Sequence, residues 1–196
     1  MSKSRAEAFS DGVFAVAATL LVFSLQVPDV KADLGRVLLN DWPSYATYGI
    51  SFGTILVIWV NHHAVLDAMA RFDRTLLFLN GFLLLTVAAL PFPTDVLAHY
   101  LQAGHDQQAA VAAYGIAMSL MACAFTFMNL YARRQGVIST PFNLLGFSFG
   151  QLMYPLGAAT SFLSWQLALF IYGGTLIFYI VLPLVREARA RAASAP

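Results

Sequence analysis

Six long apolar stretches, separated by short polar connections, constrain this chain more than any other feature of its sequence. They lie at roughly residues 7–26, 43–66, 75–98, 109–132, 141–162 and 165–185. A helix needs about 20 apolar residues to cross roughly 30 Å of hydrocarbon, and each stretch is long enough to do so. The sequence therefore predicts an all-α integral membrane protein with six transmembrane helices.

The composition agrees with this interpretation. Charged residues make up 11% of the chain and hydrophobic residues 59%, whereas about 25% of a typical soluble domain is charged. The net charge of +1 gives no reason to expect a nucleic-acid partner. The single cysteine, Cys123, cannot form an intrachain disulfide. We expect the chain to be surrounded by membrane lipids.

The basic residues predict the orientation. Nine of the eleven Lys and Arg residues fall at the N-terminus, after the second and fourth stretches, or at the C-terminus; Lys31 and Arg36 fall on the other side. Because cytoplasmic loops are enriched in Lys and Arg, both termini are expected in the cytoplasm. The first stretch is expected to be a retained helix, since Glu7 and Asp11 do not suit a signal peptide. We expect a membrane domain over 1–186 and a short basic tail over 187–196.

Capping residues and prolines mark several helix ends. Asp41 and Asp73 stand just before the second and third stretches, and Thr140 stands before the fifth. Each is a candidate N-cap, because its side-chain oxygen can accept a hydrogen bond from a free backbone N–H. Pro91 and Pro93 should kink or end the third helix, because proline lacks that N–H.

The first stretch carries polar residues in an unusual place. Ser10, Asp11 and Gly12 lie near its cytoplasmic end. Ionisable residues in membrane segments usually face a bundle interior or water, and glycine lets another backbone approach closely. Two interpretations of Asp11 remain open from spacing alone: a member of a buried functional site, or a helix cap in the headgroup region.

A stripe of bulky apolar residues follows along the same stretch. Successive members are four or three residues apart, which places them on one helix face; they are Phe9, Val13, Val16, Leu20, Phe23 and Val27. Such a stripe is typical of a packing seam, and it also suits the lining of a narrow hydrophobic pore. The spacing does not choose between the two.

The run Arg5-x-x-x-Phe9-Ser10-Asp11-Gly12 resembles the signature motif of the transmembrane protein 175 family of potassium channels. The similarity continues through Val13–Leu21 and essentially along the whole chain. Further matching residues are Trp59-x-x-His62-His63 at the end of the second stretch, Asn80 in the third, and Pro91-Phe92-Pro93-Thr94 at its close.

The resemblance implies a cation channel without the usual selectivity filter, in which the first helices of the assembly line the pore. The family's hydrophobic ring corresponds to Val16, with Leu20 and Phe23 on the following turns. Family members often have isoleucine or leucine where this chain has Val16, so either Val16 or Leu20 is the expected narrowest point. Thr19 could offer hydroxyls to a partly dehydrated potassium ion.

The resemblance also implies the assembly and its surroundings. We expect a homotetramer of six-helix subunits in a bacterial inner membrane, permeable to potassium, with other monovalent cations as an open alternative. We expect no cofactor and no bound metal. The alternative function is a secondary transporter of a small solute or ion, although helices three to six carry almost no ionisable residues near the midplane.

The remaining polar residues of the motif are expected to support the first helix rather than bind ions. Arg5 and Asp11 are six residues apart and do not face each other on one helix. We expect a buried polar network joining the first helix to one of two histidines at a similar depth and to an asparagine of the third helix. The candidate members are Ser10, Asp11, His62, His63 and Asn80.

Other motifs carry less weight. Thr47-Tyr48-Gly49 is not expected to form a filter, because the fuller Thr-Val-Gly-Tyr-Gly run is absent from the sequence. His63-x-x-x-Asp67 offers only two ligands, too few for a tetrahedral metal site. The sequence shows no nucleophile–base set, so we do not expect an enzyme.

Overall fold

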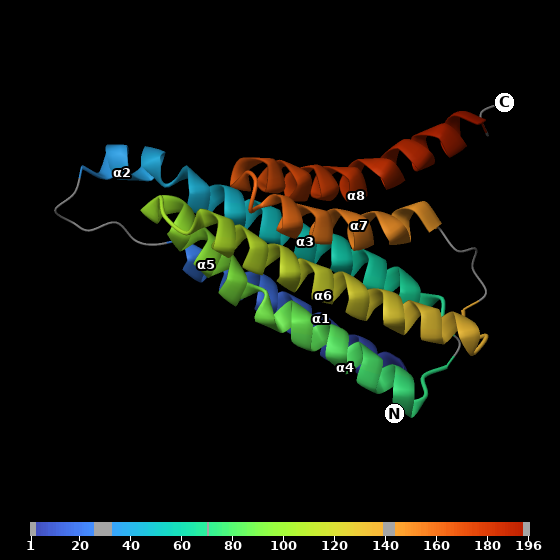
Figure 1. The fold of residues 1–196 in the computed structure, drawn as a ribbon. Coiled ribbons are helices and arrows are strands. Elements are labelled where there is room, and N and C mark those ends of the chain that lie inside the picture. The colour runs from blue at the N-terminus through green and yellow to red at the C-terminus, as the bar shows by residue number, and fades with distance from the viewer. Residues whose placement is uncertain (1–2, 26–32, 70, 139–143, 194–196) are drawn as a thin grey trace.

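The computed structural model describes residues 3–25, 33–69, 71–138 and 144–193. These residues form helices joined by turns and short loops (Figure 1). In chain order they are α1 (Lys3–Leu20), the 3₁₀ helix η1 (Leu21–Ser24), α2 (Leu34–Asn40), α3 (Trp42–Asp67), α4 (Arg74–Ala89), α5 (Pro91–Ala103), α6 (Gln107–Arg134), α7 (Leu144–Thr160) and α8 (Trp165–Ala193). The prediction of an all-α protein is confirmed.

Among the residues that the structure describes, five helical segments are long and apolar enough to cross a membrane. They are Lys3–Ser24, Trp42–Asp67, Arg74–Ala103, Gln107–Arg134 and Trp165–Arg186. The fifth expected stretch, 141–162, coincides with α7, whose described part has 17 residues. The structure thus supplies five candidate spans, and a sixth through α7 stays a prediction. The short helix α2 was not expected, and α8 runs beyond the predicted domain boundary as far as Ala193.

The predicted helix ends have different outcomes. Asp73 caps α4 as expected, because its side chain accepts a hydrogen bond from the Leu76 backbone N–H at 2.7 Å. The expected break is also present, since α4 ends at Ala89 and α5 begins at Pro91. Thr140 lies outside the described residues.

Asp41 precedes α3, but its side chain makes no capping bond to the backbone. Its carboxylate instead accepts hydrogen bonds from the Ser44 hydroxyl, at 2.6 Å, and from the side-chain amide of Gln102. The capping prediction for Asp41 is therefore wrong. The side chains of α3 and α5 satisfy this carboxylate in place of the backbone.

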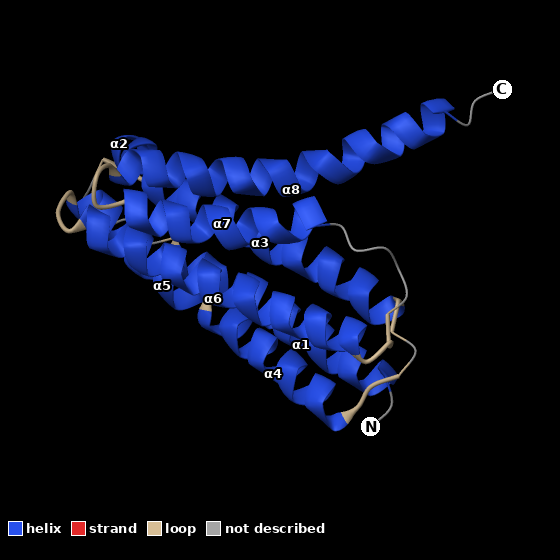
Figure 2. Cartoon of the chain, turned by 45° about the vertical axis from the view of Figure 1, so that its right-hand side comes forward, coloured by secondary structure: helices blue, strands red, loops and turns tan. Residues whose placement is uncertain are grey.

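The helices pack around α6, which contacts α4, α5, α7 and α8. On the side away from α8, α1 packs against α3 and α4 (Figures 1 and 2). Leu83, Val87, Val111 and Met128 are completely buried in the shared core. Helix α1 therefore lies at the edge of the bundle, with one face packed against α3 and α4.

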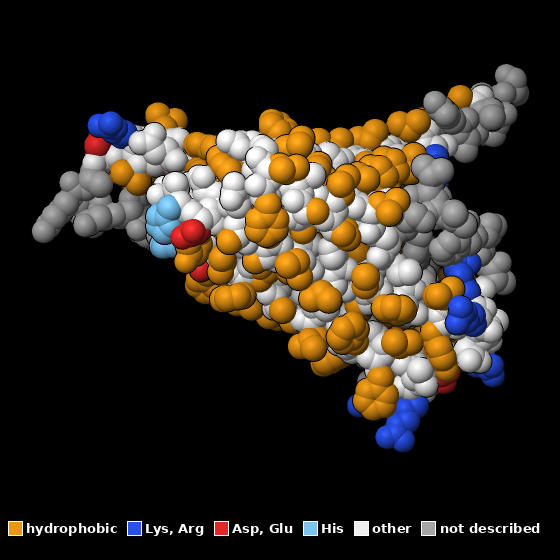
Figure 3. Space-filling model, in the orientation of Figure 1, with side chains coloured by type: hydrophobic (Ala, Val, Ile, Leu, Met, Phe, Trp, Pro, Cys, Tyr) orange, Lys and Arg blue, Asp and Glu red, His pale blue; other side chains and the backbone are white. Residues whose placement is uncertain are grey.

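Charged residues gather at the two ends of the bundle, and hydrophobic side chains cover much of the visible face between them (Figure 3). We call the end that carries the N-terminus and the α3–α4 connection the basic end; it includes Lys3, Arg71, Arg74, Arg133 and Arg134. This distribution suits a chain whose middle lies in hydrocarbon and whose ends reach the headgroups.

Two glycines let α8 approach its neighbours closely. Gly115 of α6 and Gly157 of α7 both lie against the ring of Tyr172, and a Cβ atom at either position would overlap that ring. The Tyr172 hydroxyl donates a hydrogen bond to the carbonyl of Val111 at 3.2 Å. The small residues thus fix the place where α8 crosses the bundle.

Candidate functional site

Helix α1 has one face inside the subunit and one outside it. The inner face is almost completely buried and carries Ala6, Ser10, Phe14 and Ala17, with Leu21 continuing it in η1. The outer face carries large apolar side chains that are 40% to 74% exposed, namely Phe9, Val16, Leu20 and Phe23. The rest of the described subunit leaves a large part of each of these four side chains exposed. We call them the outer stripe.

The outer stripe matches the predicted stripe with two differences. Val13 is half-buried and packs against the core, so it is not on the outer face, contrary to the prediction. Val27 lies outside the described residues. Thr19, next to the outer stripe, is exposed, and its hydroxyl donates a hydrogen bond to the carbonyl of Val16 at 2.8 Å.

A buried chain of hydrogen bonds ties the inner face of α1 to α4 and α3. The amide nitrogen of Asn80 donates to the Ser10 hydroxyl at 3.0 Å, and the amide oxygen of Asn80 lies 2.7 Å from Nε2 of His62. With the amide in this orientation, Nε2 of His62 is the donor, because an amide oxygen only accepts. The Ser10 hydroxyl in turn donates to the Ala6 carbonyl at 2.8 Å.

This chain satisfies three polar side chains in an otherwise apolar interior. Ser10, His62 and Asn80 are each at most 3% exposed, and an unpaired polar group buried at this depth would be costly. Phe14 packs against the His62 ring, with 5.2 Å between the ring centroids. The structure therefore brings together three of the five predicted network members, one from each of three helices.

Asp11 does not join this chain, contrary to the prediction. Its carboxylate accepts a hydrogen bond from the indole N–H of Trp59 at 2.8 Å, at an exposed position between α1 and α3. The reason is geometric: one residue along a helix corresponds to a rotation of about 100°. With Ser10 aimed at α4, Asp11 is turned toward α3.

His63 also lies outside the buried chain. Its Nε2 is 3.3 Å from a carboxylate oxygen of Asp67, and both side chains are more than half exposed. Its ring stacks on that of Trp59, with 6.1 Å between the centroids. His62 and His63 thus have separate roles, because neighbouring residues on α3 face different sides of the helix.

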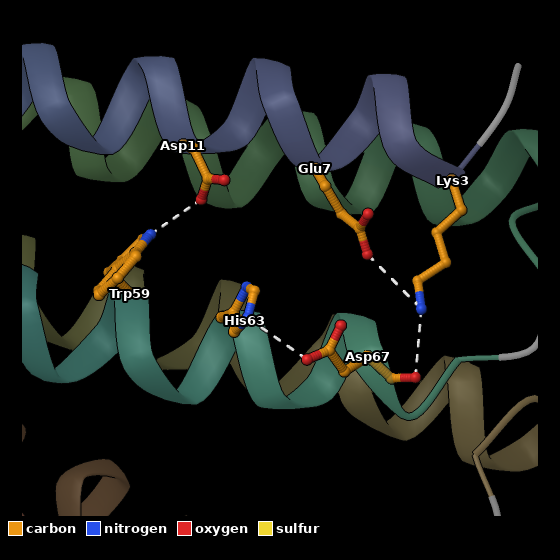
Figure 4. Close-up of polar contacts among 6 residues, drawn as sticks. All are labelled: Lys3, Glu7, Asp11, Trp59, His63 and Asp67. Carbon is orange, nitrogen blue, oxygen red and sulfur yellow. Dashed lines mark hydrogen bonds and ion pairs between the residues drawn. The ribbon is translucent and has the colours of Figure 1, made fainter.

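Figure 4 shows how these contacts continue along the seam between α1 and α3. Lys3 lies 3.5 Å from a carboxylate oxygen of Glu7 and donates to the backbone carbonyl of Asp67 at 3.1 Å. Lys3 and Glu7 were not among the predicted site residues, although their spacing of four is a recognisable signal for an ion pair on one helix. Such a partly exposed pair adds little stability by itself.

The other motif residues make fewer contacts within the subunit. Arg5 is exposed. Gly12 is exposed as well, and no heavy atom lies within 4 Å of the position that a Cβ would take there. The close backbone approach expected at Gly12 is therefore absent from the described subunit.

A second buried polar cluster was missed by the sequence analysis. The Ser51 hydroxyl on α3 lies 2.8 Å from that of Thr94 on α5 and 2.9 Å from that of Tyr114 on α6. Hydroxyl residues are common in apolar helices, so the sequence offers no specific signal for this cluster. Within the described part of the chain, no group of three or more His, Cys, Asp or Glu side chains is placed to hold a metal ion.

Comparison with known proteins adds to this geometry. The family described as "Endosomal/lysosomal potassium channel TMEM175" matches residues 5–91. A protein named potassium channel from Streptomyces collinus is 41% identical over 185 residues, which cover 89% of this chain and 90% of the relative. The human protein named endosomal/lysosomal proton channel TMEM175 is 32% identical over 117 residues, which cover 55% of this chain and 23% of that protein.

The fold has a solved counterpart. The crystal structure of a lysosomal potassium-selective channel TMEM175 homologue from Chamaesiphon minutus superposes with a TM-score of 0.81 at 35% sequence identity. The match covers 91% of this chain and 96% of that one. The motif in α1, the near full-length relative and the shared fold agree, and the chain belongs to the TMEM175 family.

Proposed function

We propose that this chain forms a potassium-permeable cation channel in which the α1 helices of several copies surround the pore. The observation that carries the proposal is the outer stripe: four large apolar side chains on α1 and η1 are 40% to 74% exposed in the subunit, while the opposite face is buried. An α1 helix at the centre of an oligomer accounts for both faces. The potassium-channel names of the relatives from Streptomyces collinus and Chamaesiphon minutus support the choice of ion.

The barrier in this proposal is a hydrophobic constriction. Val16, Leu20 and Phe23 lie on successive turns of the outer face of α1 and its 3₁₀ extension. A narrow apolar neck holds no stable water column, so it can close to ions without a moving plug. Thr19 lies beside this neck, where its hydroxyl oxygen is available to a partly dehydrated cation.

The proposed assembly is a homotetramer of six-helix subunits in a bacterial inner membrane. An open apolar groove of about 370 Å³ runs beside the outer stripe between α1 and α3, lined in part by Phe14, Ala18, Phe52 and Trp59. A neighbouring subunit packed along α1 would cover this groove as well. The basic end faces the cytoplasm in this proposal, with α7 as the sixth span and both termini on that side.

The polar contacts behind α1 act as supports for the pore helix. The bonds from Ser10 through Asn80 to His62 fix the rotation of α1, and the Asp11–Trp59 bond fixes its distance from α3. A rotation of α1 would break buried hydrogen bonds, which is costly in an apolar interior. The outer stripe therefore stays aimed at the proposed pore axis.

Single-channel recording of the purified protein in planar bilayers tests the function, with potassium on one side and sodium on the other. We expect discrete currents that reverse toward the potassium equilibrium potential. Replacing Val16, Leu20 and Phe23 together with alanine should raise the open-state current or the time spent open. A matched triple alanine variant on the exposed face of α8, at Phe170, Ile177 and Leu184, should leave both unchanged.

The same experiment separates the alternatives. Saturating counter-transport without unitary currents would indicate that the protein is a secondary transporter and not a channel. The human relative is named a proton channel. A second set of recordings therefore applies a pH gradient without a potassium gradient. A reversal potential that follows protons alone would contradict the proposed potassium permeability.

A further inference from the structure

An open cavity of about 390 Å³ lies on the opposite side of the subunit from the outer stripe, between α3, α6, α7 and α8. Each helix turns one face toward it: Thr54, Ile58 and Asn61 come from α3, while Tyr179, Pro183 and Arg186 come from α8. Residues three, four and seven positions apart share a helix face, so the cavity extends along both helices. From Tyr179 to Arg186 it follows α8 for roughly 10 Å.

The cavity lies where α8 leaves the bundle. Figure 2 shows the C-terminal part of α8 turning away from the other helices, and Pro183 lies inside that helix. Proline removes one backbone hydrogen bond and bends a helix. The lining includes both Pro183 and Arg186, so the divergence of α8 leaves a space that side chains do not fill.

The lining of the cavity is mostly apolar, with several neutral polar side chains and one cation among its described residues. Its apolar contributors include Val57, Ile58, Ala122, Phe125 and Leu176, and Arg186 is its charged member; no Asp or Glu is among its described lining residues. Arg186 is exposed and makes no hydrogen bond or ion pair with any residue that the structure describes. A guanidinium without a partner among the described residues, beside a mostly apolar cavity, favours a ligand with an anionic head and a hydrocarbon body.

The position of Arg186 indicates which ligand this is. Arg186 is the first charged residue after the apolar stretch of α8, so we expect its guanidinium to lie where the hydrocarbon meets the headgroups. The apolar lining begins just inside that level. A lipid already in the membrane would present its phosphate to Arg186 and one acyl chain to the cavity without leaving the bilayer.

We propose that this cavity binds one acyl chain of an anionic phospholipid, with Arg186 holding the phosphate. The permeant ion does not use this space, because Arg186 repels cations and the outer stripe lies on the other side of the subunit. The site is therefore separate from the proposed pore. Its occupation would set how far the C-terminal part of α8 diverges from α3.

Lipid retention by the full-length protein, measured by native mass spectrometry in a mild detergent, tests the proposal. The probes are dioleoyl phosphatidylglycerol, which is anionic, dioleoyl phosphatidylcholine, which is zwitterionic, and oleic acid. We expect preferential binding of phosphatidylglycerol. Arg186→Gln should weaken that binding roughly tenfold, as expected when one charge-assisted contact is lost.

Two further variants decide whether the cavity is the site. Arg134→Gln removes an exposed arginine at the basic end outside the cavity lining, and it should retain nearly full binding. Ala122→Phe, or Ile58→Phe if the first variant does not fold, fills the cavity and should lower the binding of phosphatidylglycerol while leaving Arg186 in place.

Three outcomes would overturn the proposal. Equal losses in Arg186→Gln and Arg134→Gln would indicate a general attraction of anionic lipid to the basic end. Full binding in a folded cavity-filled variant would place the lipid elsewhere. Binding of oleic acid that depends on Arg186, without binding of phosphatidylglycerol, would make the ligand a free fatty acid. Because the readout is binding, the test gives an answer even if the protein conducts no current.

Discussion

Asn80 on α4 donates a hydrogen bond from its side-chain amide to the hydroxyl of Ser10 on α1, with 3.0 Å between nitrogen and oxygen. The two residues are 70 positions apart in the chain and both are buried. This bond attaches the inner face of α1 to the core.

Replacing Ser10 with alanine should therefore destabilise the subunit by roughly 1–3 kcal/mol, because it leaves an amide N–H of Asn80 unpaired in the interior. Ser119→Ala is the matched control: Ser119 donates to the carbonyl four residues earlier, as Ser10 does, but no other helix donates to it in the described structure. Thermal unfolding in detergent measures the difference. Equal shifts in the two variants would mean that the bond from Asn80 contributes nothing.

Trp59→Phe should weaken the attachment of α1 to α3. The change keeps an aromatic ring next to His63 but removes the indole N–H that donates to Asp11. We expect a loss of about 1 kcal/mol, less than a buried bond to a charged group contributes, because the site is exposed. A double-mutant cycle with Asp11→Ala isolates this contact, and strictly additive losses would show that the pair is not coupled.

Thr19→Val should reduce potassium conductance if the Thr19 hydroxyl contacts the permeant ion. Valine keeps the shape but loses the oxygen, so we expect a decrease of about fivefold, equivalent to one polar contact of about 1 kcal/mol. Thr86→Val on α4 is the control, because Thr86 also donates to the carbonyl three residues earlier. Planar-bilayer recordings compare the two, and unchanged conductance in Thr19→Val would remove Thr19 from the proposed pathway.

Gly157→Ala should destabilise the packing of α8. The added methyl group would overlap the Tyr172 ring, which is itself buried, and overpacking of this kind costs roughly 1–3 kcal/mol. Gly173→Ala has open space around the new Cβ and should be neutral or stabilising, since alanine favours a helix over glycine by about 1 kcal/mol. Gly157→Ala should lower the melting temperature and Gly173→Ala should not; an equal decrease in both variants would argue against the Tyr172 contact.

The cap of α4 predicts a dependence of stability on pH. The backbone N–H of Leu76, followed by the Tyr131 hydroxyl at 2.9 Å, holds the pKa of the Asp73 carboxyl below its ordinary value. A lowered folded-state pKa stabilises the protein above the unfolded pKa, near pH 4, and this stabilisation is lost as the pH falls through the folded value.

Asp73→Asn should flatten this part of the pH profile, because asparagine still caps a helix but does not ionise. Asp33→Asn is the control, since Asp33 precedes α2 without a side-chain capping bond. Melting temperatures recorded between pH 3 and pH 6 test the prediction. An equal acid-dependent loss in the wild type and in Asp73→Asn would contradict it.

Several features could be predicted from the sequence because their causes are local. Five of the six predicted apolar stretches are candidate spans in the described structure, since any segment of that length and composition must avoid water. Asp73 caps α4 and Pro91 begins α5, because capping and the missing proline N–H act within one helical turn. The motif from Arg5 to Gly12 indicated the family for the same reason: it is contiguous in the chain.

The partners of the site residues could not be predicted, because they depend on how the helices are rotated against one another. The sequence placed Asp11, His62 and His63 at a similar depth but did not distinguish neighbouring residues on a helix. The tertiary structure directs Ser10 to Asn80 and Asp11 to Trp59, since about 100° of helical rotation separates Ser10 from Asp11.

The sequence by itself thus determined the membrane class, the helix boundaries at Asp73 and Pro91, and most of the stripe on the first helix. Only the tertiary structure decided that Val13 is half-buried against the core while Val16 is mostly exposed, and that Arg186 lies beside a cavity. Hydrophobicity and capping are properties of a segment, whereas exposure, cavities and hydrogen-bond partners arise only when several segments pack together. Those properties of the packed subunit are the ones on which the proposed pore and lipid site depend.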